Sequence, residues 1–186
     1  DGCYDTVTQA VIVNPSPALD YNWSNTCAGT ATQFTVDETI TMVAAVNSWD
    51  WDFGDGSAHS NEQNPVHTYA QYGNYNVVLT IVDSAGCSNT KVHAVTINAE
   101  PVALFSFSSG CINSATQFTD DSYTLNGEPI AAWHWDFGET AMANDTSNLK
   151  NPQWTYTAQG IYTVTLTVTT AAGCQDSTNT TIQVFP

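Results

Sequence analysis

The stretch Trp49-Asp-Trp-Asp-Phe-Gly-Asp-Gly-Ser, residues 49–57, carries the clearest structural signal in the chain. It begins by alternating large aromatic side chains with aspartates, and this period of two predicts a β-strand that buries one face. Gly54 and Gly56 then supply the backbone freedom that a tight turn needs, and aspartate side chains can bond to such turns. The stretch therefore predicts a strand that ends in a tight connection, with Trp51 as a large core anchor.

This stretch occurs twice, because Trp133-His-Trp-Asp-Phe-Gly repeats it 84 residues later. Cys27-Ala-Gly-Thr-Ala-Thr-Gln-Phe-Thr and Cys111-Ile-Asn-Ser-Ala-Thr-Gln-Phe-Thr show the same displacement. Further matches are displaced by 87 residues: Asn64-Pro65 with Asn151-Pro152, Tyr69 with Tyr156, Gly73 with Gly160, Tyr75 with Tyr162 and Cys87 with Cys174. The chain of 186 residues thus contains an internal repeat, with three residues inserted between Gly138 and Asn151.

The same spacing assigns the first residues, because Gly2-Cys3 precedes Gly86-Cys87 by 84 residues. We therefore interpret residues 1–13 as the last strand of a preceding repeat, residues 14–98 as repeat 1 and residues 99–186 as repeat 2. Short linkers are expected near residues 14–17 and 98–101. A preceding strand also predicts a longer parent protein, whose targeting segment would come before Asp1.

Each repeat is predicted to be all-β, because its hydrophobic period is two throughout. One face is formed by Tyr75, Val77, Leu79 and Ile81 in repeat 1 and by Tyr162, Val164, Leu166 and Val168 in repeat 2. Short strands separated by turns such as Ser84-Ala-Gly, with no amphipathic helix, are typical of an antiparallel β-sandwich. The predicted fold class is therefore all-β, with tandem antiparallel β-sandwiches.

Charge and cysteine content narrow the function classes. Asp and Glu total 18 against two basic residues, Lys91 and Lys150, so the net charge of −16 opposes binding to nucleic acid or to an anionic membrane. The chain also lacks the 20-residue apolar run of a membrane span. Five cysteines without a CxxC pair favour disulfides, and hence an extracellular or cell-surface location.

No catalytic motif stands out in the sequence. The histidines are not kept between the repeats, since His67 corresponds to Trp154 and His134 to Asp50. A nucleophile with a neighbouring base, or a metal-ligand motif, is what hydrolytic chemistry would require. We therefore expect no enzyme activity and no cofactor.

Trp51-Asp-Phe-Gly-Asp-Gly-Ser, Asn64-Pro-Val-His-Thr-Tyr, Gly73-Asn-Tyr-Asn-Val-Val-Leu-Thr-Ile and Ala85-Gly-Cys together resemble the signature of PKD (polycystic-kidney-disease-type) domains. The resemblance covers essentially the whole chain and implies an immunoglobulin-like sandwich. It gives structural roles to the signature residues Trp51, Asp52, Phe53, Gly54, Asp55, Gly56, Trp135, Asp136, Phe137 and Gly138. In repeat 2 Glu139-Thr replaces Asp55-Gly56, which predicts a differently shaped hairpin. Cysteine-bearing copies resemble those of large surface proteins from Bacteroidetes-like bacteria.

The resemblance leaves two disulfide patterns open. Spacing alone suggests pairs within each repeat, Cys27 with Cys87 and Cys111 with Cys174. In an immunoglobulin-like sandwich, however, these cysteines lie at opposite ends of a strand, farther apart than the Cα separation of about 7 Å that a disulfide allows. The end of one repeat would then meet the start of the next, pairing Cys27 with Cys174. Cys3 and Cys87 would then belong to partners upstream, and Cys111 would pair downstream or with a neighbouring molecule.

Calcium and glycans are the other ligands considered. Some PKD domains of bacterial collagenases bind calcium through an Asp-x-Asp-Gly motif, which is missing here, so Asp37, Asp83, Asp120 and Asp121 are weak candidates. Short patterns of Asp, Ser or Thr and a small or apolar residue resemble bacterial O-glycan attachment sites, and they predict Thr6, Ser84 and Ser177 as candidate sites. Aromatic residues considered for stacking on sugars are Tyr21, Trp23, Tyr72, Tyr123 and Trp154.

These features favour a non-catalytic structural or adhesive segment that forms a stiff extracellular stalk, adhesin or filament. Its expected partners are neighbouring PKD repeats or identical subunits, with surface glycans as a further candidate. The alternative is an accessory glycan-binding module of a secreted polysaccharide-degrading enzyme. Neighbouring sequence would discriminate between them, because further repeats favour the filament and a catalytic domain favours the accessory module.

Overall fold

The computed structural model describes residues 5–10, 16–37, 45–140, 142 and 144–186, and every regular element in them is a β-strand. The described residues contain no helix that could traverse a bilayer. Contacts divide the chain into two compact units, one of residues 1–23, 33–66 and 76–94, the other of residues 24–32, 67–75 and 95–186. Residues near Cys27 therefore belong to the same compact unit as the whole of repeat 2.

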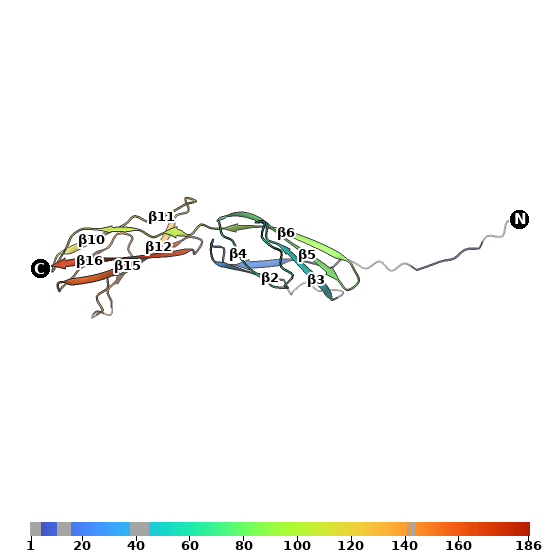
Figure 1. The fold of residues 1–186 in the computed structure, drawn as a ribbon, viewed down its shortest axis with the longest axis horizontal. Coiled ribbons are helices and arrows are strands. Elements are labelled where there is room, and N and C mark those ends of the chain that lie inside the picture. The colour runs from blue at the N-terminus through green and yellow to red at the C-terminus, as the bar shows by residue number, and fades with distance from the viewer. Residues whose placement is uncertain (1–4, 11–15, 38–44, 141, 143) are drawn as a thin grey trace. The chain divides into compact units, whose positions relative to one another are not determined.

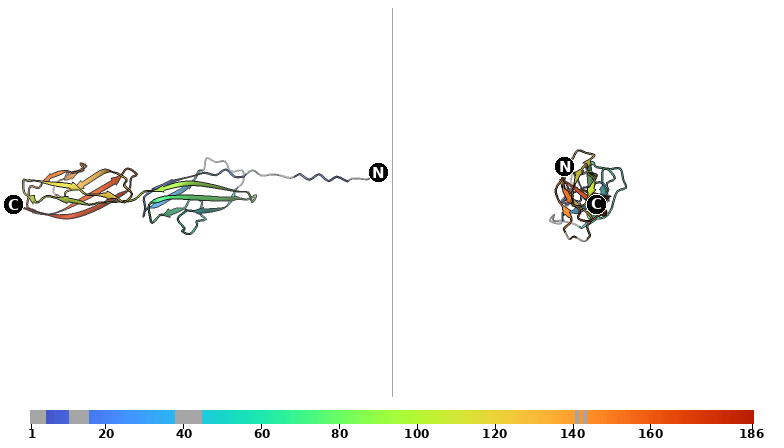
Figure 2. Two further views of the ribbon diagram at one scale, coloured as in Figure 1. Left: turned by 90° about the horizontal axis from the view of Figure 1, so that it is seen from above. Right: turned by 90° about the vertical axis from the view of Figure 1, so that its left-hand side faces the viewer.

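The strands of repeat 1 form two three-stranded sheets, with orders β1-β2-β4 and β3-β5-β6 (Figure 1). Their bounds are β1 Tyr21–Ser24, β2 Ala31–Val36, β3 Val46–Asp52, β4 Val66–Thr68, β5 Gly73–Asp83 and β6 Ser88–Ile97. Strand β3 is antiparallel to β5, with Trp51 opposite Leu79. The neighbouring strands β5 and β6 are drawn in green in Figure 2.

Repeat 2 has the same arrangement, with one sheet ordered β14-β10-β8 and a larger one ordered β13-β12-β15-β16-β9. A separate short pair joins β11 to β7. The bounds are β7 Pro101–Val102, β8 Phe105–Phe107, β9 Gly110–Cys111, β10 Ala115–Asp120, β11 Tyr123–Thr124, β12 Ile130–Asp136, β13 Thr146–Ser147, β14 Gln153–Thr155, β15 Gly160–Thr170 and β16 Gln175–Phe185. Strand β9 is parallel to the end of β16, with Cys111 opposite Phe185.

The predicted alternation of buried and exposed residues is confirmed on the long strands. Val77, Leu79 and Ile81 on β5 are fully buried, as are Val164, Leu166 and Val168 on β15. Burying each such side chain stabilises the fold by about 1.5–3 kcal/mol, so these strands provide much of each core. The predicted antiparallel all-β sandwich is therefore confirmed.

Residues 5–10 form no strand in this structure, and Val7 among them is 93% exposed. A strand needs a neighbour to bond its backbone groups, and residues 1–13 were expected to find that neighbour in a preceding repeat. Residues 1–4, with Cys3, and residues 11–13 lie outside the described residues. The assignment of residues 1–13 to a preceding repeat stays a prediction.

Candidate functional site

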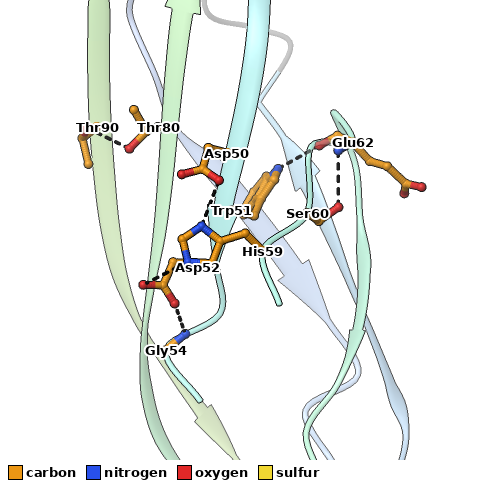
Figure 3. Close-up of polar contacts among 9 residues, drawn as sticks. All are labelled: Asp50, Trp51, Asp52, Gly54, His59, Ser60, Glu62, Thr80 and Thr90. Carbon is orange, nitrogen blue, oxygen red and sulfur yellow. Dashed lines mark hydrogen bonds and ion pairs between the residues drawn. The ribbon is translucent and has the colours of Figure 1, made fainter. Parts of the chain in front are cut away.

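Trp51 anchors the signature of repeat 1 in the core. Its ring is fully buried, with ring centroids 4.8 Å from Tyr21 and 5.5 Å from Phe34. Its Nε1 atom donates a hydrogen bond to the carbonyl oxygen of Glu62 at 3.0 Å (Figure 3). Trp135 is equally buried and donates to the carbonyl oxygen of Leu149 at 2.9 Å. Both tryptophans therefore act as structural anchors, each with its polar atom satisfied.

The turn after each tryptophan requires glycine. Asp52 Oδ1 accepts a hydrogen bond from the Gly54 amide at 2.9 Å, and Asp136 makes the same bond to Gly138. Gly54 has φ +75°, and a Cβ atom there would lie 2.5 Å from the carbonyl oxygen of Asn76. A side chain would meet both backbone strain and a steric clash at this position. The aspartates of these turns thus bind their own backbone.

Repeat 2 replaces the second part of this turn with a different set of contacts. The Glu139 amide donates to Asp145 Oδ2 at 2.6 Å, which joins the two sides of the longer hairpin. Trp154 Nε1 donates to Glu139 Oε2 at 3.0 Å, and the Trp154 ring stacks on Phe137 with centroids 4.7 Å apart. Trp154 was a candidate for sugar stacking, and its ring is partly buried against the core of repeat 2. Phe137 covers one face of the ring and Glu139 binds its polar atom, so the role of Trp154 in sugar binding stays a prediction.

A histidine and two aspartates gather on the exposed face of β3. His59 Nδ1 lies 2.9 Å from Asp50 Oδ1, and His59 Nε2 lies 3.8 Å from Asp52 Oδ2 (Figure 3). The hydrogen bond to Asp50 raises the pKa of His59 above its ordinary value. These side chains are about half exposed, and no cluster of three or more His, Cys, Asp or Glu residues in the described chain could hold a metal ion. The arrangement is an exposed ion pair that joins β3 to the following loop.

A second charged cluster tethers the segment before β1 to β6. Asp20 Oδ1 lies 2.7 Å from His93 Nε2, and Asp20 Oδ2 accepts a bond from Lys91 Nζ at 3.2 Å. Hydrogen bonds from His93 and from the Tyr21 amide lower the pKa of Asp20 to about 2. No local sequence pattern points to this cluster, because about 70 residues separate Asp20 from its two partners.

Cys27 and Cys174 form a disulfide with Cα atoms 5.6 Å apart. Cys174 directly precedes β16, whereas Cys111 pairs with Phe185 at the other end of that strand. The 11 residues of β16 span about 33 Å at roughly 3.3 Å per residue, far beyond the reach of a disulfide. The fold therefore excludes the within-repeat alternative, in which Cys111 pairs with Cys174. In repeat 1 Cys27 likewise forms a β-bridge with Asn98, just beyond β6, while Cys87 precedes that strand.

The sequence model of the PKD domain matches residues 14–97 and again residues 98–184. The chain belongs to the PKD domain family. Among its relatives is the collagenase ColA of Bacillus cereus, 41% identical over 69 residues, which are 37% of this chain and 7% of that protein. Another is the pre-pro-metalloprotease PrtV of Vibrio cholerae, 37% identical over 89 residues, which are 48% of this chain and 9% of that protein. The chain thus matches less than a tenth of either relative.

A solved structure of the PKD1 domain from the Vibrio cholerae metalloprotease PrtV is also similar to one PKD repeat. It is 33% identical, with a TM-score of 0.42, and the match covers 47% of this chain and 99% of that domain. The PKD1 domain of Vibrio anguillarum Epp gives a similar match, at 32% identity and a TM-score of 0.42, covering 47% of this chain and 96% of that domain.

Two of the four calcium candidates, Asp83 and Asp120, accept hydrogen bonds at their carboxylates. Asp83 is buried and accepts bonds from the amides of Ala85 and Cys87 at 2.9 and 2.8 Å. Asp120 accepts bonds from the Ser122 amide and from Trp133 Nε1. Asp121 is exposed, and the Asp37 amide donates to the carbonyl oxygen of Asp20. Calcium would have to compete with these donors at Asp83 and Asp120.

The remaining candidates occupy different environments. The O-glycan candidates Thr6, Ser84 and Ser177 are all exposed. Tyr21 is buried and Trp23 is partly buried against it, so both serve the core of repeat 1. Tyr72 and Tyr123 are 43% and 49% exposed. Exposure thus leaves Tyr72 and Tyr123 as the aromatic candidates available to a ligand.

A cleft of about 310 Å³ lies beside Tyr123 in the second PKD repeat, lined also by Asp120, Ser122, Thr124, Glu128, Pro129, Ile130, Trp133 and Lys150. Lys150 Nζ lies 5.5 Å from the Trp133 ring centroid and 3.9 Å from Asp120 Oδ2. Glu128 Oε2 is buried and has no hydrogen-bond partner in the described part of the chain. Sequence reasoning missed this cleft, although Asp120 and Lys150 replace Val36 and Gln63 of repeat 1.

Proposed function

We propose that the two PKD repeats form a non-catalytic spacer of an extracellular or cell-surface protein, as part of a stalk, adhesin or filament. The observation that carries this proposal is the disulfide between Cys27 and Cys174, which links residues of repeat 1 and repeat 2 covalently. Together with the short connection from Ile97 to Pro101, it gives the repeats two covalent links. Two links restrict bending and twisting more than one link does, as a spacer requires.

The location is part of the same proposal. Disulfides persist in oxidising compartments, and they are rare where thiols are kept reduced. The acidic surface, with a net charge of −16, favours solubility and opposes adhesion to anionic polymers. Both properties support a protein that works outside the cell.

The test compares inter-repeat flexibility with and without the bond. Small-angle X-ray scattering of the double variant Cys27→Ser with Cys174→Ser should give a broader distribution of interatomic distances than the unaltered chain. Cys111→Ser is the matched control, because it removes an exposed thiol and leaves the linking disulfide intact. Identical scattering from the double variant and the control would refute a stiffening role.

The alternative is an accessory glycan-binding module, and the cleft beside Tyr123 is the observation that favours it. An aromatic ring, hydroxyl groups and carboxylates can together bind the apolar face and the hydroxyl groups of a sugar. A sugar hydroxyl could also donate to Glu128 Oε2, whose lack of a partner costs about 1–3 kcal/mol. The relatives named above are a collagenase and a metalloprotease, in which the matching segment is a small part of the whole enzyme. A module that binds a substrate for a neighbouring catalytic domain agrees with that arrangement.

Affinity electrophoresis in gels that contain soluble polysaccharides tests this alternative. Retardation should be lost in Tyr123→Ala and kept in Tyr72→Ala, which removes an equally exposed ring outside the cleft. If neither the unaltered chain nor Tyr72→Ala is retarded by any polysaccharide, the glycan-binding role is excluded for those sugars. Equal retardation of both variants would place binding elsewhere.

A further inference from the structure

The turn that carries Cys111 reproduces the turn that carries Cys27. The residue after each cysteine donates its amide proton to the end of the last strand: Ala28 to Asn98 at 2.9 Å, and Ile112 to Phe185 at 2.8 Å. The next residue donates to the tyrosine carbonyl before the following strand: Gly29 to Tyr69 and Asn113 to Tyr156, both at 2.8 Å. The turn closes with Thr30 donating to Cys27 and Ser114 donating to Cys111, both at 3.2 Å.

The turn on the other side of the disulfide is also duplicated. The Thr170 amide donates a hydrogen bond to the carbonyl oxygen of Cys174 at 2.9 Å, and the Asp83 amide donates to the carbonyl oxygen of Cys87 at the same distance. Each turn places a glycine, Gly173 or Gly86, directly before the cysteine at positive φ. Each repeat therefore carries both cysteine positions of the linkage. One cysteine precedes β2 or β10, and the other precedes the last strand, β6 or β16.

We propose that Cys111 is the attachment point for a further PKD repeat, through a disulfide to the cysteine that precedes that repeat's last strand. The backbone hydrogen bonds around Cys111 match those that hold Cys27 in position for its bond to Cys174. Cys111 is also an exposed free thiol. This inference rests on the proposed spacer function, because it extends the linkage seen between repeats 1 and 2. It also names the partner, which is a sandwich carrying a Cys174-type turn.

The surface beside Cys111 supports an occupant of this kind. Ile161 and Phe185, on the neighbouring strands β15 and β16, are 73% and 52% exposed. The equivalent positions in repeat 1 are Asn74 and Asn98, and Asn98 donates from its side chain to Thr26. Asn98 is partly buried whereas Asn74 is exposed, so by this equivalence a further repeat that places its cysteine next to Cys111 would cover Phe185.

The bond-forming step is an oxidation that needs a named oxidant. A small-molecule disulfide, such as oxidised glutathione, accepts two electrons and releases two thiols while the two protein thiols lose two protons and become one disulfide. The Cys111 thiolate attacks the small disulfide first, and the thiolate of the incoming repeat then displaces the second small thiol. The sulfur and proton count is balanced in both exchanges.

The test extends the chain by one repeat. Pro186 is replaced with a second copy of residues 99–186, because Phe185 corresponds to Asn98 and this recreates the natural connection while keeping Phe185. After refolding with oxidised and reduced glutathione, the denatured protein is digested with trypsin without reduction. We expect peptide 92–150, which carries Cys111, in disulfide linkage with the last peptide of the added copy.

Three results would overturn the inference. Peptide 92–150 of the extended protein could be recovered only as the alkylated monomer, or Cys111 of the unaltered chain could prove inaccessible to iodoacetamide under native conditions. The unaltered chain could also form a covalent dimer by a bond between two Cys111 residues under the same refolding conditions, which would assign this thiol to its own counterpart in a second molecule. In the matched extended variant Cys111→Ser, the added copy's last cysteine should become reactive toward thiol reagents.

The scattering test of Cys27 and Cys174 is a separate experiment, so the spacer proposal and the Cys111 proposal can fail independently.

Discussion

Cys27 and Cys174 lie in one disulfide with Cα atoms 5.6 Å apart, although 147 residues separate them in the sequence. Trypsin can show whether Cys174 bonds to the peptide that carries Cys27 or to the one that carries Cys111, because the two lysines divide the chain into peptides 1–91, 92–150 and 151–186. Cys27 lies in the first peptide, Cys111 in the second and Cys174 in the third. A non-reducing digest of denatured protein should therefore give peptide 1–91 linked to peptide 151–186. Peptide 92–150 linked to peptide 151–186 would contradict the structure.

Native digestion should begin at Lys150. This residue follows β13 in an irregular segment and its side chain is 58% exposed, whereas Lys91 lies inside β6 and bonds to Asp20. We expect one early cut, after Lys150, and slow cleavage after Lys91. The nicked chain should migrate as one species until reductant is added, because the disulfide holds fragments 1–150 and 151–186 together. Early cleavage after Lys91 would show that β6 opens more readily than its hydrogen bonds suggest.

Replacing Gly54 with alanine should destabilise repeat 1 by about 3 kcal/mol, combining roughly 1–2 kcal/mol for a side chain at positive φ with the cost of the clash at Asn76. Gly56→Ala is the matched control, because Gly56 has φ +78° but no described atom within 4 Å of the place that a Cβ would take. That variant should lose only the roughly 1–2 kcal/mol that a side chain at positive φ costs. Urea unfolding followed by tryptophan fluorescence measures both changes, and equal losses would show that the close approach to Asn76 is relieved.

Asp20 should make stability depend on pH between about 4 and 2. Its pKa in the folded chain is about 2, below its ordinary value of 3.8, so the unfolded chain binds this proton more readily. The stabilisation is therefore complete above about pH 4 and is lost as the pH falls toward 2. Because the side chain is 40% exposed, we expect a contribution of only about 0.2–1 kcal/mol.

The measurement is the difference in unfolding free energy between Asp20→Asn and the unaltered chain. We expect this difference to shrink as the pH is lowered from 5 to 2, because protonation removes the same interactions in the unaltered chain. A difference that stays constant over this interval would mean that the bonds to His93 and Lys91 do not depend on the charge of Asp20.

Removing calcium should change thermal stability only slightly. Asp83 and Asp120 already accept hydrogen bonds from amide and indole N–H groups, so a cation would have to displace these donors in order to bind their oxygens. We expect EDTA to shift Tm by less than about 2 °C, which for a domain of this size corresponds to less than about 0.5 kcal/mol. A large fall in Tm that calcium reverses, and magnesium does not, would identify a specific calcium site.

The repeat, the strand faces and the anchoring tryptophans could all be predicted from the order of residues along the chain. These features are local: a period of two places Val77, Leu79 and Ile81 on one face whatever the partner strand, and Gly54 is required by its own turn. The family resemblance rested on the same local patterns, and the matches to residues 14–97 and 98–184 confirm it.

Contacts between distant side chains could not be predicted in this way. The sequence shows Trp154 only as an aromatic residue without an aromatic equivalent in repeat 1, but strand pairing places it against Phe137, which covers one face of its ring. Likewise, spacing alone allowed Cys111 to pair with Cys174, and the parallel pairing of β9 with the far end of β16 separates them. Side-chain periodicity follows from the geometry of a single strand, whereas these contacts depend on the order and direction in which strands join a sheet.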